Sequence, residues 1–139
     1  SLSTLIHQFD LETQIILTGP RTDIPHVMNA IDLHILSSVG EAFPNTVAEA
    51  MACGTPCVVT DFGDAALIVG DTGWVAPPQN TKTLAERIEQ VLATLQREGR
   101  GTLGQRCRTR IVENFSLEKM VRAYRTVWET ATVSGTSLT

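Results

Sequence analysis

The sequence predicts an α/β fold in which a parallel sheet is flanked by helices. Short apolar runs of strand length alternate with segments whose apolar residues recur at helical spacing, which is typical of parallel α/β proteins. Turns rich in Gly and Pro separate these runs, as at Gly54-Thr55-Pro56. The chain of 139 residues is long enough for one domain of ordinary size.

The first half of the chain supplies most of the predicted sheet. Strands are predicted for three apolar runs, at residues 14–18, 33–37 and 56–60. Helices are predicted between and before them, at residues 2–9, 25–30 and 44–53. Pro44 suits the first turn of a helix, where its missing N–H costs nothing, and the Gly-x-Pro turn ends that helix.

The second half is mainly helical. A short helix at 65–69 and a strand at 73–76 precede a long helix at 80–97, in which five apolar residues form one stripe: Leu84, Ile88, Val91, Leu92 and Leu95. We expect the chain to loosen at 99–104. Ser116 is the expected N-cap of a last helix at 116–131 with a wide apolar face, and 132–139 form a flexible tail.

Two glutamates with seven residues between them, Glu41 and Glu49, mark the candidate site. If the helix begins near Pro44, the amides of Asn45, Thr46 and Val47 are free to bind an anion at the positive end of the helix dipole. A carboxylate accepts two neighbouring hydroxyl donors, so each Glu suits a vicinal diol. Two sugar rings joined by a pyrophosphate, as in a nucleotide-sugar, satisfy all these groups.

The segment from Gly40 to Asp61, followed by the Gly-Asp-Ala-Ala-Leu and Thr-Gly-Trp-Val-Ala-Pro-Pro stretches, resembles the C-terminal, Rossmann-like half of a GT-B glycosyltransferase. The family is the retaining group 1, or family 4. The resemblance implies that Glu41 contacts the transferred hexose as the catalytic residue and that Glu49 binds the ribose. It further assigns the sugar and diphosphate to Phe43, Pro44, Asn45 and Thr46, and the base to the loop that carries Gly19 and Arg21.

The resemblance also implies the partners of the chain. Residues 1–131 would be a nucleotide-sugar-binding domain truncated at its N-terminus, with 116–131 as the crossover helix to an absent N-terminal acceptor domain. The donor would be a UDP-, GDP- or ADP-sugar, and neither a metal nor another cofactor is expected. We expect a cytoplasmic enzyme of polysaccharide biosynthesis, with peripheral contact to the inner face of the membrane through the absent half, and an isolated fragment without activity.

The amino-acid composition limits the functional classes to which the protein can belong. The net charge of −4 and the lack of a basic cluster argue against nucleic-acid binding. The three cysteines, an odd number, are expected to be reduced thiols. Two alternatives stay open: a non-catalytic nucleotide-binding module, and a glycoside hydrolase that uses the two carboxylates.

Two positions depart from the family pattern. Ala42 stands where the family usually has Gly, so the loop would be strained if its backbone needs a positive φ. Gly63 and Asp64 belong to a stretch that replaces the commoner Gly-Gly-x-x-Glu, which we interpret as a variation within the family.

Overall fold

A three-stranded parallel sheet lies at the centre of the structure, a computed structural model that describes residues 1–134 and the side chains of residues 1–131. The strands β1 (His34–Leu36), β2 (Cys57–Thr60) and β3 (Trp74–Ala76) lie in that order across the sheet. Leu36 pairs with Val59, and Val59 with Val75. All four residues of β2 are buried, as expected for a central strand that is covered on both faces.

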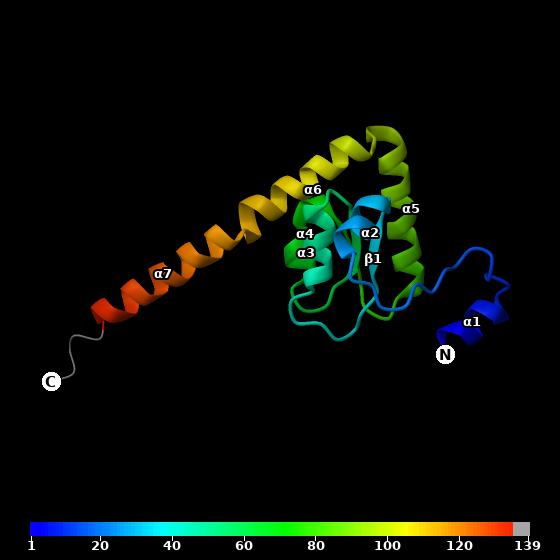
Figure 1. The fold of residues 1–139 in the computed structure, drawn as a ribbon, viewed down its shortest axis with the longest axis horizontal. Helices are drawn as coiled ribbons and strands as arrows, with labels where there is room; N and C mark the ends of the chain where they lie inside the picture. Colours follow the sequence, from blue (N-terminus) through cyan, green and yellow to red (C-terminus); the bar gives the residue numbers. More distant parts are fainter. Residues whose placement is uncertain (135–139) are drawn as a thin grey trace.

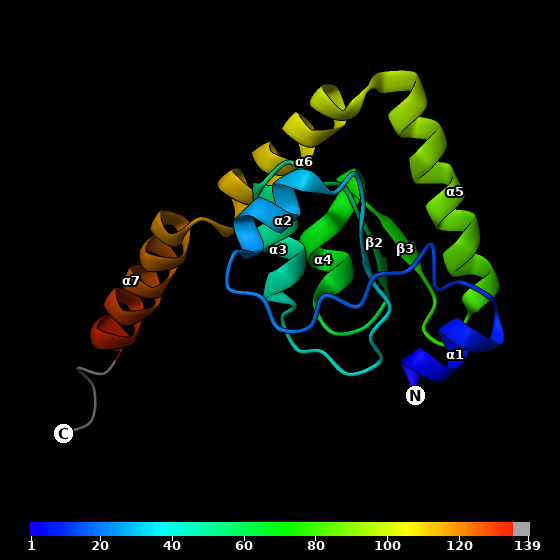
Figure 2. The same ribbon diagram turned by 45° about the vertical axis from the view of Figure 1, so that its right-hand side comes forward.

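Helices cover both faces of this sheet (Figures 1 and 2). The connections α3 (Asn45–Ala52) and α4 (Ala65–Val69) pack on one face, where Cys57 and Val59 join the apolar core. The intervening Val58 points to the opposite face because side chains alternate along a strand. That face is covered by α5 (Thr81–Glu98), which contacts β2 and β3 and buries Val91. Both crossovers lie on one face, as the right-handed rule requires for strands added in one direction.

The helix α6 (Arg100–Phe115) packs along α3 and corrects one expectation. Residues 99–104 were expected to loosen the chain, but the helix begins at Arg100 and contains Gly101 and Gly104. Gly104 serves close packing, since a Cβ at this position would collide with the carbonyl oxygen of Gly54. A glycine within a helix therefore marks a close approach between backbones here rather than a break.

Two arginines of α6 hold the ends of neighbouring helices. Arg108 donates to the carbonyl of Ala52 at the end of α3 (2.5 Å), and Arg110 donates to the carbonyls of Leu67 and Ile68 near the end of α4 (2.6 and 2.7 Å). The last carbonyls of a helix lack partners within it, so these guanidinium groups satisfy acceptors that would otherwise be open.

The last helix, α7 (Leu117–Ser134), extends away from the domain (Figure 1). Ser116 caps it as predicted, its Oγ accepting from the amide of Lys119 (3.3 Å). The helix runs three residues beyond the predicted end at 131, and the rest of the predicted tail, 135–139, lies outside the described residues. Its apolar face is exposed, with Trp128 at 67%.

The strand predicted at residues 14–18 is wrong. No strand forms between α1 (Leu2–Gln8) and α2 (Ile24–Ala30), and Ile15, Ile16 and Leu17 are exposed instead. An apolar run gives strand propensity, but a strand also needs a neighbour to share its hydrogen bonds, and this segment does not pair with β1. The other predicted strands and helices are confirmed within one residue at each end, except for the last helix, which ends three residues later than predicted.

Candidate functional site

The candidate residues gather at the carboxyl edge of the sheet. The loop after β1, residues 37–44, leads directly into α3, and the loop after β2, residues 61–64, lies beside it because the amide of Asp64 donates to the carbonyl of Ala42 (2.8 Å). In open α/β sheets, ligands bind outside the carboxyl ends of the strands. Glu41 and the start of α3 therefore occupy the edge at which a ligand is expected.

Hydroxyl groups at the ends of two strands orient Glu41. The Oγ of Ser38 donates to the Oε1 of the half-buried Glu41 (3.1 Å), and the Oγ1 of Thr60 donates to the carbonyl of Ser38 (2.5 Å). Within residues 1–134, no other hydrogen bond to this carboxylate is recorded, so it keeps acceptor capacity for a ligand. Ser38 and Thr60 are not among the residues that the sequence singles out. The available signal was a polar residue at the end of each of two adjacent apolar strands.

The start of α3 presents two free backbone donors. Pro44 is the buried N-cap, so the helix begins one residue later than predicted, and the amide of Val47 donates to the carbonyl of Pro44 (3.1 Å). The prediction that Val47 leaves its amide free is therefore wrong. In the described part of the chain, the amides of Asn45 and Thr46 donate no hydrogen bond. These two N–H groups and the helix dipole form a site suited to an anion.

The exposed face of α3 carries the second glutamate. Asn45, Thr46 and Glu49 are exposed, whereas Val47 and Met51 are buried on the opposite face. Residues three and four apart share one face of a helix, so Glu49 follows Asn45 and Thr46 along the same stripe, at about 6 Å of rise from Asn45. The stripe combines two backbone donors, two small polar side chains and one carboxylate on a solvent-facing surface.

Two residues of the Glu41 loop have mainly structural contacts. Phe43 packs its ring against Phe115 at the end of α6, with centroids 6.0 Å apart. This ring contact anchors the loop, so Phe43 can reach a ligand most readily through its backbone. Ala42 does not have a positive φ, which in this structure occurs outside glycine only at Asp10 and Gln79 among the described residues. The loop accommodates Ala42 without the strain that the sequence suggested.

The loop expected to bind the base lies at the same end of the domain as residues 37–44 (Figure 2). Gly19 has a φ of +63°, and the exposed Arg21 binds Asp23 through two hydrogen bonds (2.8 and 2.5 Å). Hydrogen bonding from Arg21 lowers the pKa of Asp23. Within the described chain, no hydrogen bond or ion pair joins this loop to residues 38–49. The structure thus brings Glu41, Phe43, Pro44, Asn45, Thr46 and Glu49 into one continuous segment, with Gly19 and Arg21 on a separate loop.

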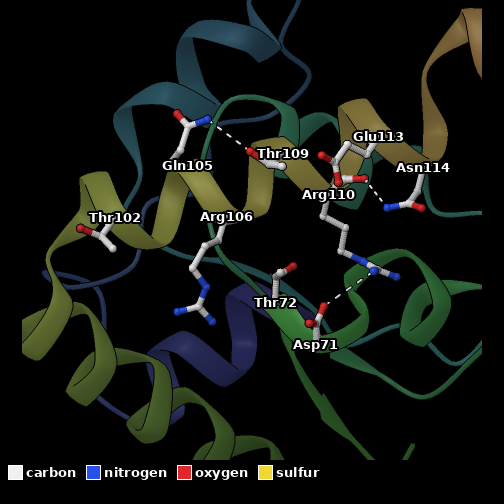
Figure 3. Close-up of a pocket in the computed structure, with 9 residues that line it drawn as sticks. All are labelled: Asp71, Thr72, Thr102, Gln105, Arg106, Thr109, Arg110, Glu113 and Asn114. Carbon is white, nitrogen blue, oxygen red and sulfur yellow. Dashed lines mark hydrogen bonds and ion pairs between the residues drawn. The ribbon is translucent and has the colours of Figure 1, made fainter.

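A cavity of about 570 Å³ lies elsewhere, between α6 and the 3₁₀ turn η1 (Gly70–Thr72) (Figure 3). Since η1 precedes β3, this turn is at the amino edge of the sheet, opposite Glu41. The two arginines that line the cavity are already paired, Arg106 with Glu98 (2.8 Å) and Arg110 with Asp71 (3.7 Å) and with α4. Because both arginines already bind carboxylates, and because the cavity lies at the edge of the sheet opposite Glu41, we do not take it as the candidate site.

We also searched the described residues for metal sites and for membrane-spanning helices. The described residues contain no group of three or more His, Cys, Asp or Glu residues placed to hold a metal ion. None of their helices combines the length and apolar character needed to cross a membrane.

The sequence matches the family Glycosyl transferases group 1 over residues 1–94. It is 30% identical to N-acetyl-alpha-D-glucosaminyl L-malate synthase of Bacillus anthracis over 126 residues, which cover 89% of this chain and 32% of that protein. It is also 30% identical to the lipopolysaccharide core biosynthesis mannosyltransferase LpsB of Rhizobium meliloti, covering 86% of this chain and 34% of the relative.

Solved structures agree with this match. Anabaena HepE in complex with UDP-glucose superposes with a TM-score of 0.80 at 26% identity, covering 93% of this chain and 36% of HepE. The chain thus spans about a third of the length of its relatives. From the matched residues and the shared architecture, the chain belongs to the group 1 glycosyltransferase family and has the fold of part of a GT-B glycosyltransferase.

Proposed function

We propose that this chain is the donor-binding half of a retaining glycosyltransferase that moves a hexose from a nucleotide-sugar to an acceptor hydroxyl. The observation that carries the proposal is the start of α3, where the free amides of Asn45 and Thr46 lie between the Glu41 loop and the exposed Glu49. Backbone donors suit a diphosphate, and the flanking carboxylates suit the hydroxyls of two sugar rings. The UDP-glucose complex of HepE supports this type of ligand.

Each group has one role in this proposal. The amides of Asn45 and Thr46 bind the diphosphate, Glu49 accepts the ribose hydroxyls, and Glu41 accepts hydroxyls of the hexose. Phe43 and Pro44 hold the loop in place and offer backbone groups to the donor. Gly19 and Arg21 border the base, for which the planar guanidinium of Arg21 is a stacking surface once it turns from Asp23.

In the proposed reaction, the bond between the anomeric carbon and the donor phosphate breaks while the acceptor oxygen bonds to the same face of that carbon. The acceptor proton passes to the departing diphosphate. The helix dipole and the two amides of α3 stabilise the negative charge that develops on this diphosphate. The chain therefore acts by positioning the donor and by electrostatic stabilisation, and no metal is assigned a role.

The acceptor is assigned to a second domain. The exposed apolar face of α7 supports this assignment, because it is a surface suited to packing against another folded unit. The site on this chain presents groups for the donor alone, so the two domains together would complete the enzyme. Cleft closure between them would then exclude water from the reaction.

Nucleotide titration tests the proposal. With the intact polypeptide that carries this chain, UDP, GDP and ADP are titrated calorimetrically together with their glucose conjugates. We expect saturable binding of at least one pair. Glu49→Gln should weaken that binding about 10- to 100-fold, since a hydrogen bond to a charged group contributes about 1.5–3 kcal/mol.

Glu89→Gln is the matched control, because Glu89 is an exposed glutamate on α5, on the opposite face of the sheet. It should leave nucleotide affinity unchanged. Failure of all three nucleotides and their conjugates to bind would contradict the proposal. Release of free sugar from a simple glycoside without any nucleotide would favour the hydrolase instead.

A further inference from the structure

We propose that the end of β2 and the loop that follows it, residues 60–63, form a brace that positions the carboxylate of Glu41 for the sugar of the donor. Thr60 and Gly63 are the positioning residues, and they act through Ser38 and through the backbone of the Glu41 loop. The inference rests on the proposed function, because it takes the Glu41 carboxylate to be the group that contacts the hexose.

The first contact of the brace is a chain of hydroxyl groups. Thr60 is only 4% exposed, and its Oγ1 reaches the carbonyls at the end of the neighbouring strand, those of Ser38 (2.5 Å) and Leu36 (3.4 Å). Ser38 in turn donates its Oγ to the Oε1 of Glu41 (3.1 Å). A buried hydroxyl at the end of the central strand thus fixes Ser38, the residue that orients the carboxylate of Glu41.

The second contact acts on the backbone. Gly63 has a φ of +54°, and a Cβ at this position would collide with the carbonyl oxygen of Glu41 and lie 2.5 Å from that of Ala42. The next residue, Asp64, donates its amide to the carbonyl of Ala42 (2.8 Å). Any side chain at position 63 must therefore push the Glu41 loop outward and stretch this hydrogen bond.

The brace is itself anchored to the sheet. The amide of Asp61 donates to the carbonyl of Ala76 at the end of β3 (2.8 Å), and the amide of Phe62 donates to the carbonyl of Thr60 (2.9 Å). These bonds tie the loop to two adjacent strands. A displacement forced at Gly63 therefore falls on the Glu41 loop at residues 41 and 42, the residues that the added Cβ would meet and of which Ala42 is exposed.

This geometry predicts that a defect in residues 60–63 affects binding of the hexose but not binding of the nucleotide. The nucleotide is assigned to α3 and Glu49, and among the described residues no hydrogen bond joins residues 60–63 to this helix. The hexose is assigned to Glu41. A defect in the brace should therefore weaken binding of a nucleotide-sugar without weakening binding of the corresponding nucleoside diphosphate. A general loss of folding would weaken both.

Gly63→Ala is the first test, with Gly99→Ala as its control. Both glycines have a positive φ, so alanine is strained at either position, but a Cβ at Gly99 meets nothing within 4 Å. The control therefore carries backbone strain without the collision. In the intact polypeptide, Gly63→Ala should lower the affinity for UDP-glucose, or for whichever conjugate the wild type binds, about tenfold. Its affinity for the bare diphosphate should change less than about twofold, and Gly99→Ala should change neither affinity.

Thr60 supplies a second test that does not depend on the folding of the Gly63 variant. Thr60→Val keeps the shape and removes the hydroxyl, so it should reproduce the selective loss of nucleotide-sugar affinity, and Thr60→Ser should restore it. Equal losses for the conjugate and the diphosphate, or a Thr60→Val protein with wild-type affinity for both, would overturn the brace. A wild-type protein that binds neither ligand would instead contradict the proposed function.

Discussion

At the scale of single residues, His34 makes the stability of the domain sensitive to pH. It lies in β1 with its Nε2 buried and, among the described residues, without a hydrogen-bond partner. Burial lowers the pKa of His34 by desolvation of the charged ring. The folded protein therefore keeps this ring neutral at a pH at which the unfolded chain, with a histidine pKa of about 6.5, already takes up a proton.

The sign of the pH dependence follows from linkage. Below about pH 6.5 the unfolded state binds more protons at this position than the folded state, so acidification favours unfolding. We expect the urea midpoint to fall between pH 7.5 and pH 5.5, and His34→Leu to make that fall smaller. His26→Leu is the control, because His26 is exposed on α2. An equal fall in the wild type and in His34→Leu would contradict the assignment.

Residues of the site differ in how far the sequence reveals them. The pair Glu41 and Glu49 is visible as a spacing around a helix start, and the structure places Glu41 in the loop at the carboxyl edge of the sheet and Glu49 about one turn into α3. The contacts of Ser38 and Thr60 depend on the register of two strands, in which Leu36 lies beside Val59. The spacing of residues along one segment does not encode that register. The hydrogen bonds of Ser38 and Thr60 between strands can therefore be identified only from the structure.

At the scale of elements, the two glycines within α6 should respond in opposite ways to alanine. A Cβ at Gly104 would collide with the backbone of Gly54, whereas a Cβ at Gly101 meets nothing within 4 Å. We expect Gly104→Ala to lower the free energy of unfolding by about 1–3 kcal/mol through overpacking. Gly101→Ala should raise it by up to about 1 kcal/mol, because alanine favours helix.

Urea unfolding of the two variants, followed by circular dichroism, compares them in one helix. The Gly101 variant serves as the control for helix propensity, so the difference between the two measures the close contact of α6 with the turn after α3. Two variants of equal stability would show that α6 can move away from Gly54 at little cost.

The boundaries of the helices and strands were only partly predictable from the sequence. Strong periodicity located α5 within one residue of its predicted ends, and the alternation of strands and helices gave the parallel sheet. The apolar run at 14–18 has strand propensity but no pairing partner, and the glycines at 101 and 104 look like breakers but permit close packing. In both cases a tertiary contact, present or absent, decides the outcome over local propensity.

At the scale of the whole molecule, the apolar residues of the sheet and its helices are buried, whereas those of α7 are exposed to solvent. The sheet and its helices bury a continuous core. In the part of the chain that the structure describes, α7 packs against α6 and exposes an apolar face: Leu117, Met120, Val121, Tyr124, Val127 and Trp128. Apolar patches of this kind on a folded protein usually mark a surface that binds another unit. This is the surface assigned above to the acceptor domain.

Fluorescence quenching of Trp128 tests that assignment. The chain has two tryptophans, so Trp74→Phe leaves Trp128 as the only one. In the 139-residue chain alone, Trp128 is 67% exposed, and acrylamide should quench its emission strongly. In the intact polypeptide, with any tryptophan outside these 139 residues also replaced by Phe, the quenching constant should fall several-fold, because the acceptor domain would cover the ring.

The dependence of quenching on protein concentration distinguishes two partners for this face, a second copy of the chain and the acceptor domain. If a second copy of the chain covered α7, quenching in the isolated chain would fall as its concentration rises, and Val121→Glu would restore it by placing a charge in the apolar face. We expect neither concentration dependence nor a Val121→Glu effect in the isolated chain, and an increase in quenching for Val121→Glu in the intact polypeptide. Equal, strong quenching of Trp128 with and without the rest of the polypeptide would show that α7 is not the surface that joins the two domains.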